Sequence, residues 1–104
     1  MHNIALPIAK KYIDEVKKSG IPVESAYLFG SYAKGSYHKW SDIDICIISP
    51  DFGKNYFDES LYLRKLTHKI DSRIEPIPFN TNDINDKYST LASEIKKYGI
   101  NLLD

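Results

Sequence analysis

Two aspartates separated by a single residue are the part of this sequence best suited to chemistry. Asp42 and Asp44 begin the run Asp-Ile-Asp-Ile-Cys-Ile-Ile, whose β-branched residues predict a strand over residues 42–48. Side chains alternate between the faces of a strand, so both carboxylates share one face with Cα atoms roughly 6.5 Å apart. Two such carboxylates repel each other unless a cation lies between them, and oxygen ligands suit Mg²⁺. The spacing therefore predicts a metal site at Asp42 and Asp44. The opposite face carries three residues that we expect in the core: Ile43, Ile45 and Ile47.

A second chemical feature is the pair Gly30-Ser31, which follows a predicted buried strand over residues 25–29. Glycine lets the backbone turn sharply and approach a ligand closely. The amides that follow begin a predicted helical turn, where N–H groups are suited to phosphate oxygens. The Ser31 hydroxyl is a further donor, and the Lys34 ammonium can neutralise phosphate charge. We therefore expect Gly30, Ser31 and Lys34 to hold a phosphate group. The alternative interpretation is ordinary turn chemistry at Gly30 and a solvated side chain at Lys34.

The elements that position these residues alternate between helices and strands. Apolar residues at helical spacing predict a first helix that begins near Ile4 and ends at Ser19-Gly20. The remaining predicted elements are strands over 25–29, 42–48 and 73–79, a helical turn over 31–34, and helices over 58–70 and 88–98. Pro76 and Pro78 favour an edge position for the strand 73–79. For the helix 58–70 we expect four core contacts: Leu61, Leu63, Leu66 and Ile70. This order predicts an α/β or α+β fold.

Length and composition narrow the class of protein. The chain has 104 residues, which predicts a single domain over residues 1–104. Its 42% apolar content excludes a disordered composition, and no stretch reaches the ~20 apolar residues of a membrane helix. The formal net charge is zero, which argues against extensive nucleic-acid binding. The single cysteine, Cys46, excludes an intramolecular disulfide and a cysteine-rich zinc site. The N-terminus does not have the pattern of a signal peptide, so we expect a cytoplasmic protein.

The segment from Gly30-Ser31-Tyr32-Ala33-Lys34-Gly35 through Ser41-Asp42-Ile43-Asp44-Ile45 resembles the minimal nucleotidyltransferase (MNT) family of the DNA polymerase β superfamily. The resemblance implies a small mixed β-sheet flanked by helices. It also implies that the Gly-Ser pair holds a nucleoside triphosphate and that the two aspartates bind catalytic Mg²⁺. A third acid on a neighbouring strand usually completes the site of this family. Glu75 is the best match for that acid, and Asp71 is the alternative.

The resemblance also implies a reaction. In nucleotidyl transfer an acceptor oxygen attacks the α-phosphorus in line and pyrophosphate leaves, assisted by two metal ions ~3.5–4 Å apart. We expect Asp42 and Asp44 to bridge the ions and Glu75 to ligate the one near the nucleophile. The implied function is an Mg²⁺-dependent transfer of AMP from ATP to a protein hydroxyl. Small members of the family are commonly antitoxins encoded with HEPN-domain toxins, so a HEPN toxin is the expected partner.

Two alternatives remain open from the sequence. The chain can be a binding antitoxin that neutralises a HEPN toxin by contact without catalysis, although such a protein has no use for clustered acids. Transfer to a small molecule, such as an aminoglycoside, is the second alternative, and it is disfavoured because those enzymes generally carry an added helical domain. A substrate presented by a homo-oligomer is also compatible with so short a chain. The acceptor and the base preference do not follow from the sequence.

Overall fold

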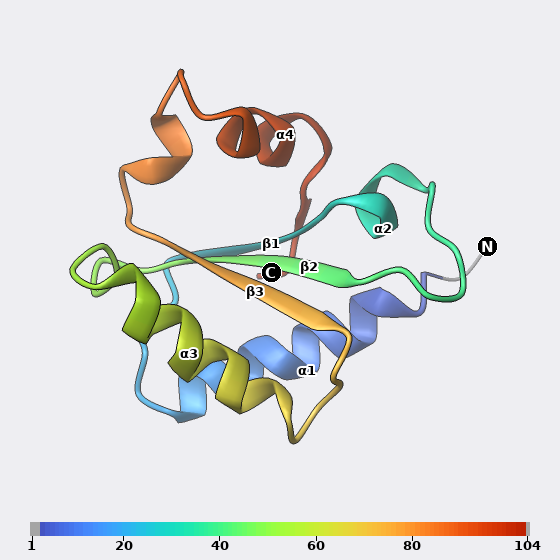
Figure 1. Cartoon of the computed structure of the whole chain (residues 1–104), viewed down its shortest axis with the longest axis horizontal. Coiled ribbons are helices and arrows are strands. Elements are labelled where there is room, and N and C mark those ends of the chain that lie inside the picture. Colours follow the sequence, from blue (N-terminus) through green and yellow to red (C-terminus); the bar gives the residue numbers. More distant parts are fainter. Residues whose placement is uncertain (1–2, 104) are drawn as a thin grey trace.

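A computed structural model describes residues 3–103 of the chain as four helices, a 3-10 turn and four strands. The bounds in chain order are α1 (Ala5–Lys18), β1 (Ser25–Phe29), α2 (Ser31–Lys34), β2 (Ile43–Ile48), α3 (Tyr56–Thr67), β3 (Ile74–Phe79), η1 (Asp83–Asn85), α4 (Thr90–Tyr98) and β4 (Ile100–Asn101). Figure 1 shows the strands as a central layer between two groups of helices. The expected sheet flanked by helices is therefore confirmed.

The strands form one mixed sheet in the order β3-β2-β1-β4. β2 pairs antiparallel with β1 and parallel with β3, and the short β4 pairs antiparallel with the other side of β1. β3 is thus an edge strand, as its two prolines predicted, because a proline without an N–H is tolerated where no neighbour needs the donor. The central position of β2 places its acidic end between β1 and β3. This neighbourhood decides which residues surround Asp42 and Asp44.

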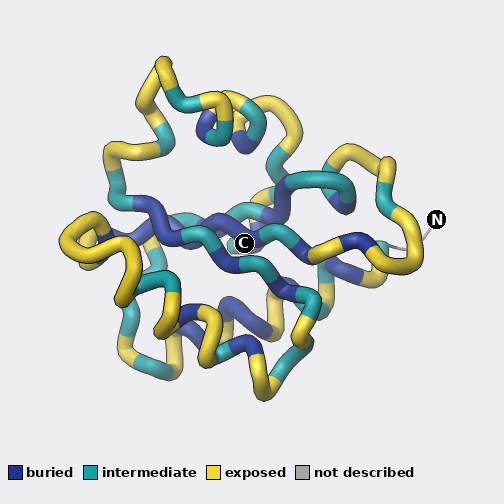
Figure 2. Tube along the Cα trace, in the orientation of Figure 1, coloured by how far each residue is buried: buried dark blue, intermediate teal, exposed yellow. Residues whose placement is uncertain are grey.

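The two faces of the sheet bury separate apolar clusters. α1 and α3 cover one face, and α4 with η1 lies over the other (Figure 1). The three isoleucines at alternate positions of β2 lie in the larger cluster with α1 and α3: Ile43, Ile45 and Ile47. Cys46 and Ile48 lie in the smaller cluster beside Ala92 and Ile95 of α4. The predicted alternation along this strand is confirmed, and Figure 2 shows the strands as the most deeply buried part of the chain.

Helix boundaries differ from the sequence prediction where capping side chains decide them. α3 begins at Tyr56 rather than Asp58 because the Asn55 side chain accepts a hydrogen bond from the N–H of Asp58. It ends at Thr67 rather than Ile70. α4 begins at Thr90 because Ser89 caps it in the same way. The predicted core contact of Leu61 is wrong: its side chain is 52% exposed, since the buried stripe of α3 passes through Leu63 and Thr67 instead.

Two short elements were not predicted from the sequence. The 3-10 turn η1 joins β3 to α4, and β4 follows α4 directly to pair with β1. Both are too short to carry a periodic apolar pattern. Within the described range 3–103, no helix combines the length and apolar character needed to cross a membrane.

Candidate active site

The turn between β1 and α2 is built around Gly30. Its φ of 74° and ψ of −152° lie in a region that only glycine adopts readily. The Gly30 carbonyl accepts hydrogen bonds from the N–H groups of Ala33 and Lys34, which closes the helical turn α2. N–H groups at the beginning of a helical turn have no partner within the helix. The turn therefore has the donor-rich backbone that the sequence predicted for Gly30 and Ser31.

Asp44 lies at the acidic end of β2, on the face that α4 covers, and Asp42 is two residues before it. Asp42 is exposed and immediately precedes the strand, whereas Asp44 is partly buried. The loop before Asp42 is held by Ser41, whose buried hydroxyl accepts a hydrogen bond from the N–H of His38 at 2.8 Å. The Ser41 N–H in turn donates to the His38 carbonyl. Ser41 therefore fixes where the strand begins, a supporting role that sequence reasoning missed.

Gly30 and Asp44 are in direct contact. Asp44 pairs with Phe29 in the β1–β2 register, so its side chain lies beside the residue that follows Phe29. A Cβ atom added to Gly30 would lie 2.2 Å from Asp44 Oδ2 and 3.1 Å from its Cγ, far inside van der Waals contact. The absence of a side chain at residue 30 thus leaves the space that the Asp44 carboxylate occupies. The structure therefore brings the predicted phosphate-binding turn and the predicted metal-binding acid into contact.

The parallel pairing of β2 and β3 brings Glu75 beside Asp44. These two residues are register partners, so their side chains lie on the same face of the sheet. Asp71 lies before β3 and is bound by Arg73, with hydrogen bonds from the Arg73 Nε at 3.0 Å and Nη2 at 2.8 Å. The structure therefore brings Glu75, rather than Asp71, next to the aspartates. The part of either residue in metal binding stays a prediction.

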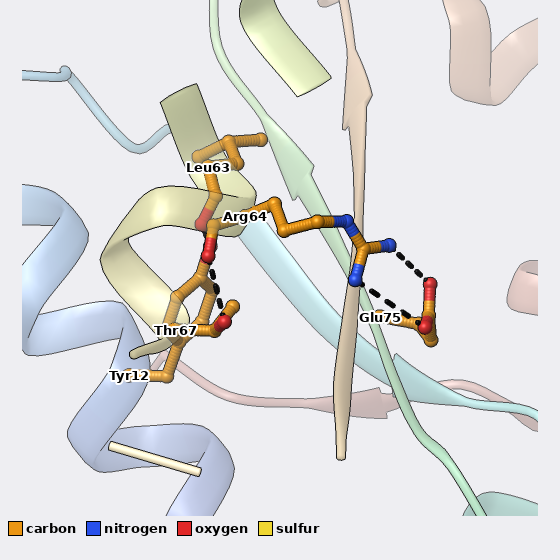
Figure 3. Close-up of polar contacts among 5 residues, drawn as sticks. All are labelled: Tyr12, Leu63, Arg64, Thr67 and Glu75. Carbon is orange, nitrogen blue, oxygen red and sulfur yellow. Dashed lines mark hydrogen bonds and ion pairs between the residues drawn. The ribbon is translucent and has the colours of Figure 1, made fainter. Parts of the chain in front are cut away.

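The Glu75 carboxylate is turned toward Arg64 of α3 (Figure 3). Both guanidinium Nη atoms donate to it, one to each carboxylate oxygen. Sequence reasoning missed Arg64, because no local pattern links a residue of α3 to a residue of β3. Among residues 3–103, no three Asp, Glu, His or Cys side chains converge on one point. Mutual repulsion of carboxylates and the pull of Arg64 account for that spread.

Lys34 points toward α4. Its Nζ lies 3.2 Å from Glu94 Oε1 and 5.4 Å from the centre of the Tyr98 ring. The structure thus places this predicted phosphate ligand next to the site, with its ammonium engaged by an acid that the sequence did not single out. Both side chains of the ion pair are about one third exposed, so solvent screens the pair and weakens it. Phosphate binding by Lys34 stays a prediction.

The electrostatics of the site centre on Asp44. Partial burial, followed by the negative charges of Asp42, Glu75 and Glu94, raises the pKa of Asp44 to about 6 from its ordinary value of 3.8. A carboxylate held among other carboxylates and away from water is stabilised by any cation that enters. The donors are all carboxylate oxygens, which is the ligand chemistry of Mg²⁺. The acidic end of β2 therefore has the ligand type and the negative charge that a divalent cation requires, and metal binding there stays a prediction.

Comparison with known proteins identifies the domain. Residues 9–100 match the family described as the nucleotidyltransferase domain. The chain belongs to this family. It is 30% identical over 88 residues to the protein adenylyltransferase MntA of Shewanella oneidensis, a match that covers 84% of this chain and 59% of that protein. The predicted relationship to the minimal nucleotidyltransferases is thereby confirmed.

Solved nucleotidyltransferase structures have the same fold. A candidate nucleotidyltransferase from Sulfolobus solfataricus is 27% identical to this nucleotidyltransferase domain, with a TM-score of 0.67 over 92% of this chain and 77% of that chain. A chain from a toxin–antitoxin structure with AMP-PNP is also 27% identical, with a TM-score of 0.66 over 90% of this chain and 72% of that one. The nucleotidyltransferase domain described here spans less than two thirds of the length of the curated relatives it matches.

Proposed function

We propose that this domain transfers AMP from ATP to a hydroxyl group of a protein, and that the acceptor is a HEPN-domain toxin for which the chain is the antitoxin. The observation that carries the proposal is the contact between Gly30 and the Asp44 carboxylate. It unites a turn suited to a triphosphate with an acid suited to Mg²⁺. Membership of the nucleotidyltransferase family and the similarity to a protein adenylyltransferase support the choice of reaction. A cytoplasmic location belongs to the same proposal, since ATP is the donor.

The roles of the residues follow from their positions. Asp42, Asp44 and Glu75 would hold the Mg²⁺ ions, two in number by analogy with related enzymes. When bound, these ions would increase the nucleophilicity of the acceptor oxygen and stabilise the leaving pyrophosphate. In the reaction, the acceptor oxygen forms a bond to the α-phosphorus and the bond from that phosphorus to the bridging oxygen breaks, so that pyrophosphate leaves with that oxygen. The hydroxyl proton passes to solvent water. Glu75 is the carboxylate that we assign to the side of the acceptor.

The triphosphate would be held by the β1–α2 turn. The backbone of Gly30 and Ser31 presents N–H donors, and the Ser31 hydroxyl adds one more. Lys34 contributes its charge by exchanging the Glu94 carboxylate for a phosphate oxygen. That exchange is feasible because the Lys34–Glu94 pair is solvent-screened. The backbone N–H groups of the turn are in place before the nucleotide binds, so less reorganisation is needed during transfer.

The test is transfer of label from α-labelled ATP to a candidate HEPN-domain protein in the presence of Mg²⁺. We expect labelled acceptor from the unchanged protein, none after removal of Mg²⁺ by a chelator, and none from the double variant Asp42→Ala plus Asp44→Ala. The matched control is Asp14→Ala plus Asp51→Ala, which removes two exposed aspartates that lie outside both motifs. Transfer that survives loss of Asp42 and Asp44 would overturn the assigned chemistry.

A binding assay in parallel separates the alternatives. A complex with the HEPN-domain protein that forms without any transfer of label would favour an antitoxin that acts by contact. Transfer of label to an aminoglycoside instead of the protein would favour a small-molecule acceptor.

A further inference from the structure

Arg64 projects toward Glu75 from a turn of α3 whose neighbouring residues are buried and hydrogen-bonded. The buried Tyr12 hydroxyl of α1 donates a hydrogen bond to the Leu63 carbonyl at 2.7 Å, and the Thr67 hydroxyl donates to the Arg64 carbonyl at 2.7 Å. Leu63 and Thr67 are themselves buried. The backbone on both sides of Arg64 is therefore held by the core, while its side chain, 48% exposed, reaches out of it (Figure 3).

The Arg64 side chain reaches around the edge of the sheet. α3 packs on the face that buries Ile74, whereas Glu75, the next residue of β3, points to the opposite face. Because β3 is the edge strand, no further strand stands between α3 and Glu75 on that side. Figure 3 shows the guanidinium passing β3 to meet the Glu75 carboxylate. Arg64, from the helix α3 on one face of the sheet, thus binds the Glu75 carboxylate on the other face.

Both oxygens of the Glu75 carboxylate are engaged by Arg64. These are the atoms that a divalent cation would need if Glu75 is a ligand, because carboxylates bind Mg²⁺ through the same lone pairs. The contact from Nη2 is short, at 2.5 Å, whereas that from Nη1 is long, at 3.5 Å. The pair is charge-assisted but partly exposed to solvent, which weakens it, so a divalent cation can compete with the guanidinium. Glu75 and Asp44 are register partners in β3 and β2, so the pair with Arg64 leaves Glu75 beside Asp44 on the same face of the sheet.

We propose that Arg64 is a positioning residue that competes with the divalent cation for the Glu75 carboxylate and thereby lowers the affinity of the site for the cation. The inference rests on the proposed function, because it assumes a metal site at Asp42, Asp44 and Glu75. In the metal-free protein Arg64 binds the Glu75 carboxylate and keeps it from converging with the aspartates. Loss of the guanidinium leaves Glu75 free to complete the ligand set.

The test is a titration of the whole metal-free chain with Mn²⁺, followed by the electron paramagnetic resonance signal of free Mn²⁺. We expect Arg64→Gln to bind Mn²⁺ about three- to tenfold more tightly, the size expected for removing one positive charge close to a divalent cation. The matched control is Lys65→Gln, which removes the same charge from the neighbouring exposed position of α3. We expect its affinity to equal that of the unchanged protein. Circular dichroism confirms that each variant is folded.

A double-mutant cycle shows whether Arg64 acts through Glu75. In a Glu75→Gln background, we expect the added Arg64→Gln change to have no effect on Mn²⁺ affinity. An equal gain in both backgrounds would overturn the proposal, because Arg64 would then act as a general charge. Mn²⁺ binding by the unchanged protein with no gain in Arg64→Gln would also overturn it while leaving the proposed function intact. Absence of Mn²⁺ binding by the unchanged protein would overturn both.

Discussion

The α-carbon of Gly30 lies directly against the carboxylate of Asp44, and the space between them would not hold a methyl group. This contact joins two segments that the chain separates by a helical turn and a loop. It requires a glycine for two reasons, the positive φ and the proximity of the acid. The two reasons can be separated by experiment.

We expect Gly30→Ala to abolish nucleotidyl transfer and to lower the free energy of unfolding by about 1–3 kcal/mol. The new methyl group would force Asp44 away from its position as well as strain the backbone. Gly20→Ala is the matched control, because Gly20 also has a positive φ and no atom within 4 Å of an added Cβ. It should lose stability and keep transfer. Denaturant unfolding and the labelled-ATP assay measure the two effects, and an active Gly30→Ala protein would contradict the proposed site.

The raised pKa of Asp44 makes the stability of the metal-free protein depend on pH. Because the pKa is higher in the folded state, at about 6, than its ordinary 3.8, the charged carboxylate opposes folding above pH 6. Stability should therefore fall as the pH rises between these two values. Asp44→Asn removes the charge, and we expect it to raise the free energy of unfolding at pH 8 by about 1–2 kcal/mol after allowance for solvent screening.

The stabilisation by Asp44→Asn should shrink as the pH is lowered from about 6 toward 3.8, since the native aspartate is then protonated. Urea unfolding at several pH values measures it. Asp51→Asn, at an exposed turn residue, is the control and should give no such trend. A stabilisation by Asp44→Asn that is the same at every pH would show that charge is not its cause.

The third acid can be identified by comparing two neutral substitutions. Glu75→Gln should reduce nucleotidyl transfer by ~100-fold, a loss typical of removing one group that stabilises charge in the transition state. Asp71→Asn should leave transfer unchanged, because the Asp71 carboxylate is bound by Arg73 before β3. Single-turnover rates with labelled ATP provide the measurement. The reverse ranking would assign the role to Asp71.

The buried hydroxyl of Tyr12 stabilises the turn that carries Arg64. Burial raises the pKa of this phenol well above its ordinary value, so it remains a hydrogen-bond donor at neutral pH. Tyr12→Phe leaves the Leu63 carbonyl without that donor, and we expect a loss of about 1 kcal/mol in the free energy of unfolding. Tyr62→Phe, at an exposed position of α3, should change nothing measurable. Equal stability of the two variants would show that the hydrogen bond contributes little.

The local parts of the site were predictable because they follow from short-range geometry. A period of two along β2 buries the three isoleucines on one face and leaves Asp44 on the other, as the sequence predicted. Asp42 immediately precedes the strand, so its sharing of that face stays a prediction. The order of helices and strands followed from apolar spacing and from glycine and proline positions. The single domain over residues 1–104 stays a prediction, and residues 1, 2 and 104 lie outside the described residues.

Only the tertiary structure decided which residues meet across the sheet. Strand order places Glu75 beside Asp44, whereas Asp71 precedes β3 and is bound locally by Arg73. The packing of α3 brings Arg64 to Glu75, and that of α4 brings Glu94 to Lys34. The pairs Asp44–Glu75, Arg64–Glu75 and Lys34–Glu94 join residues that are distant in the chain. Their contact depends on how strands and helices pack together rather than on any local pattern. The sequence by itself determined the chemistry available at the acidic end of β2, and long-range pairing decided its neighbours.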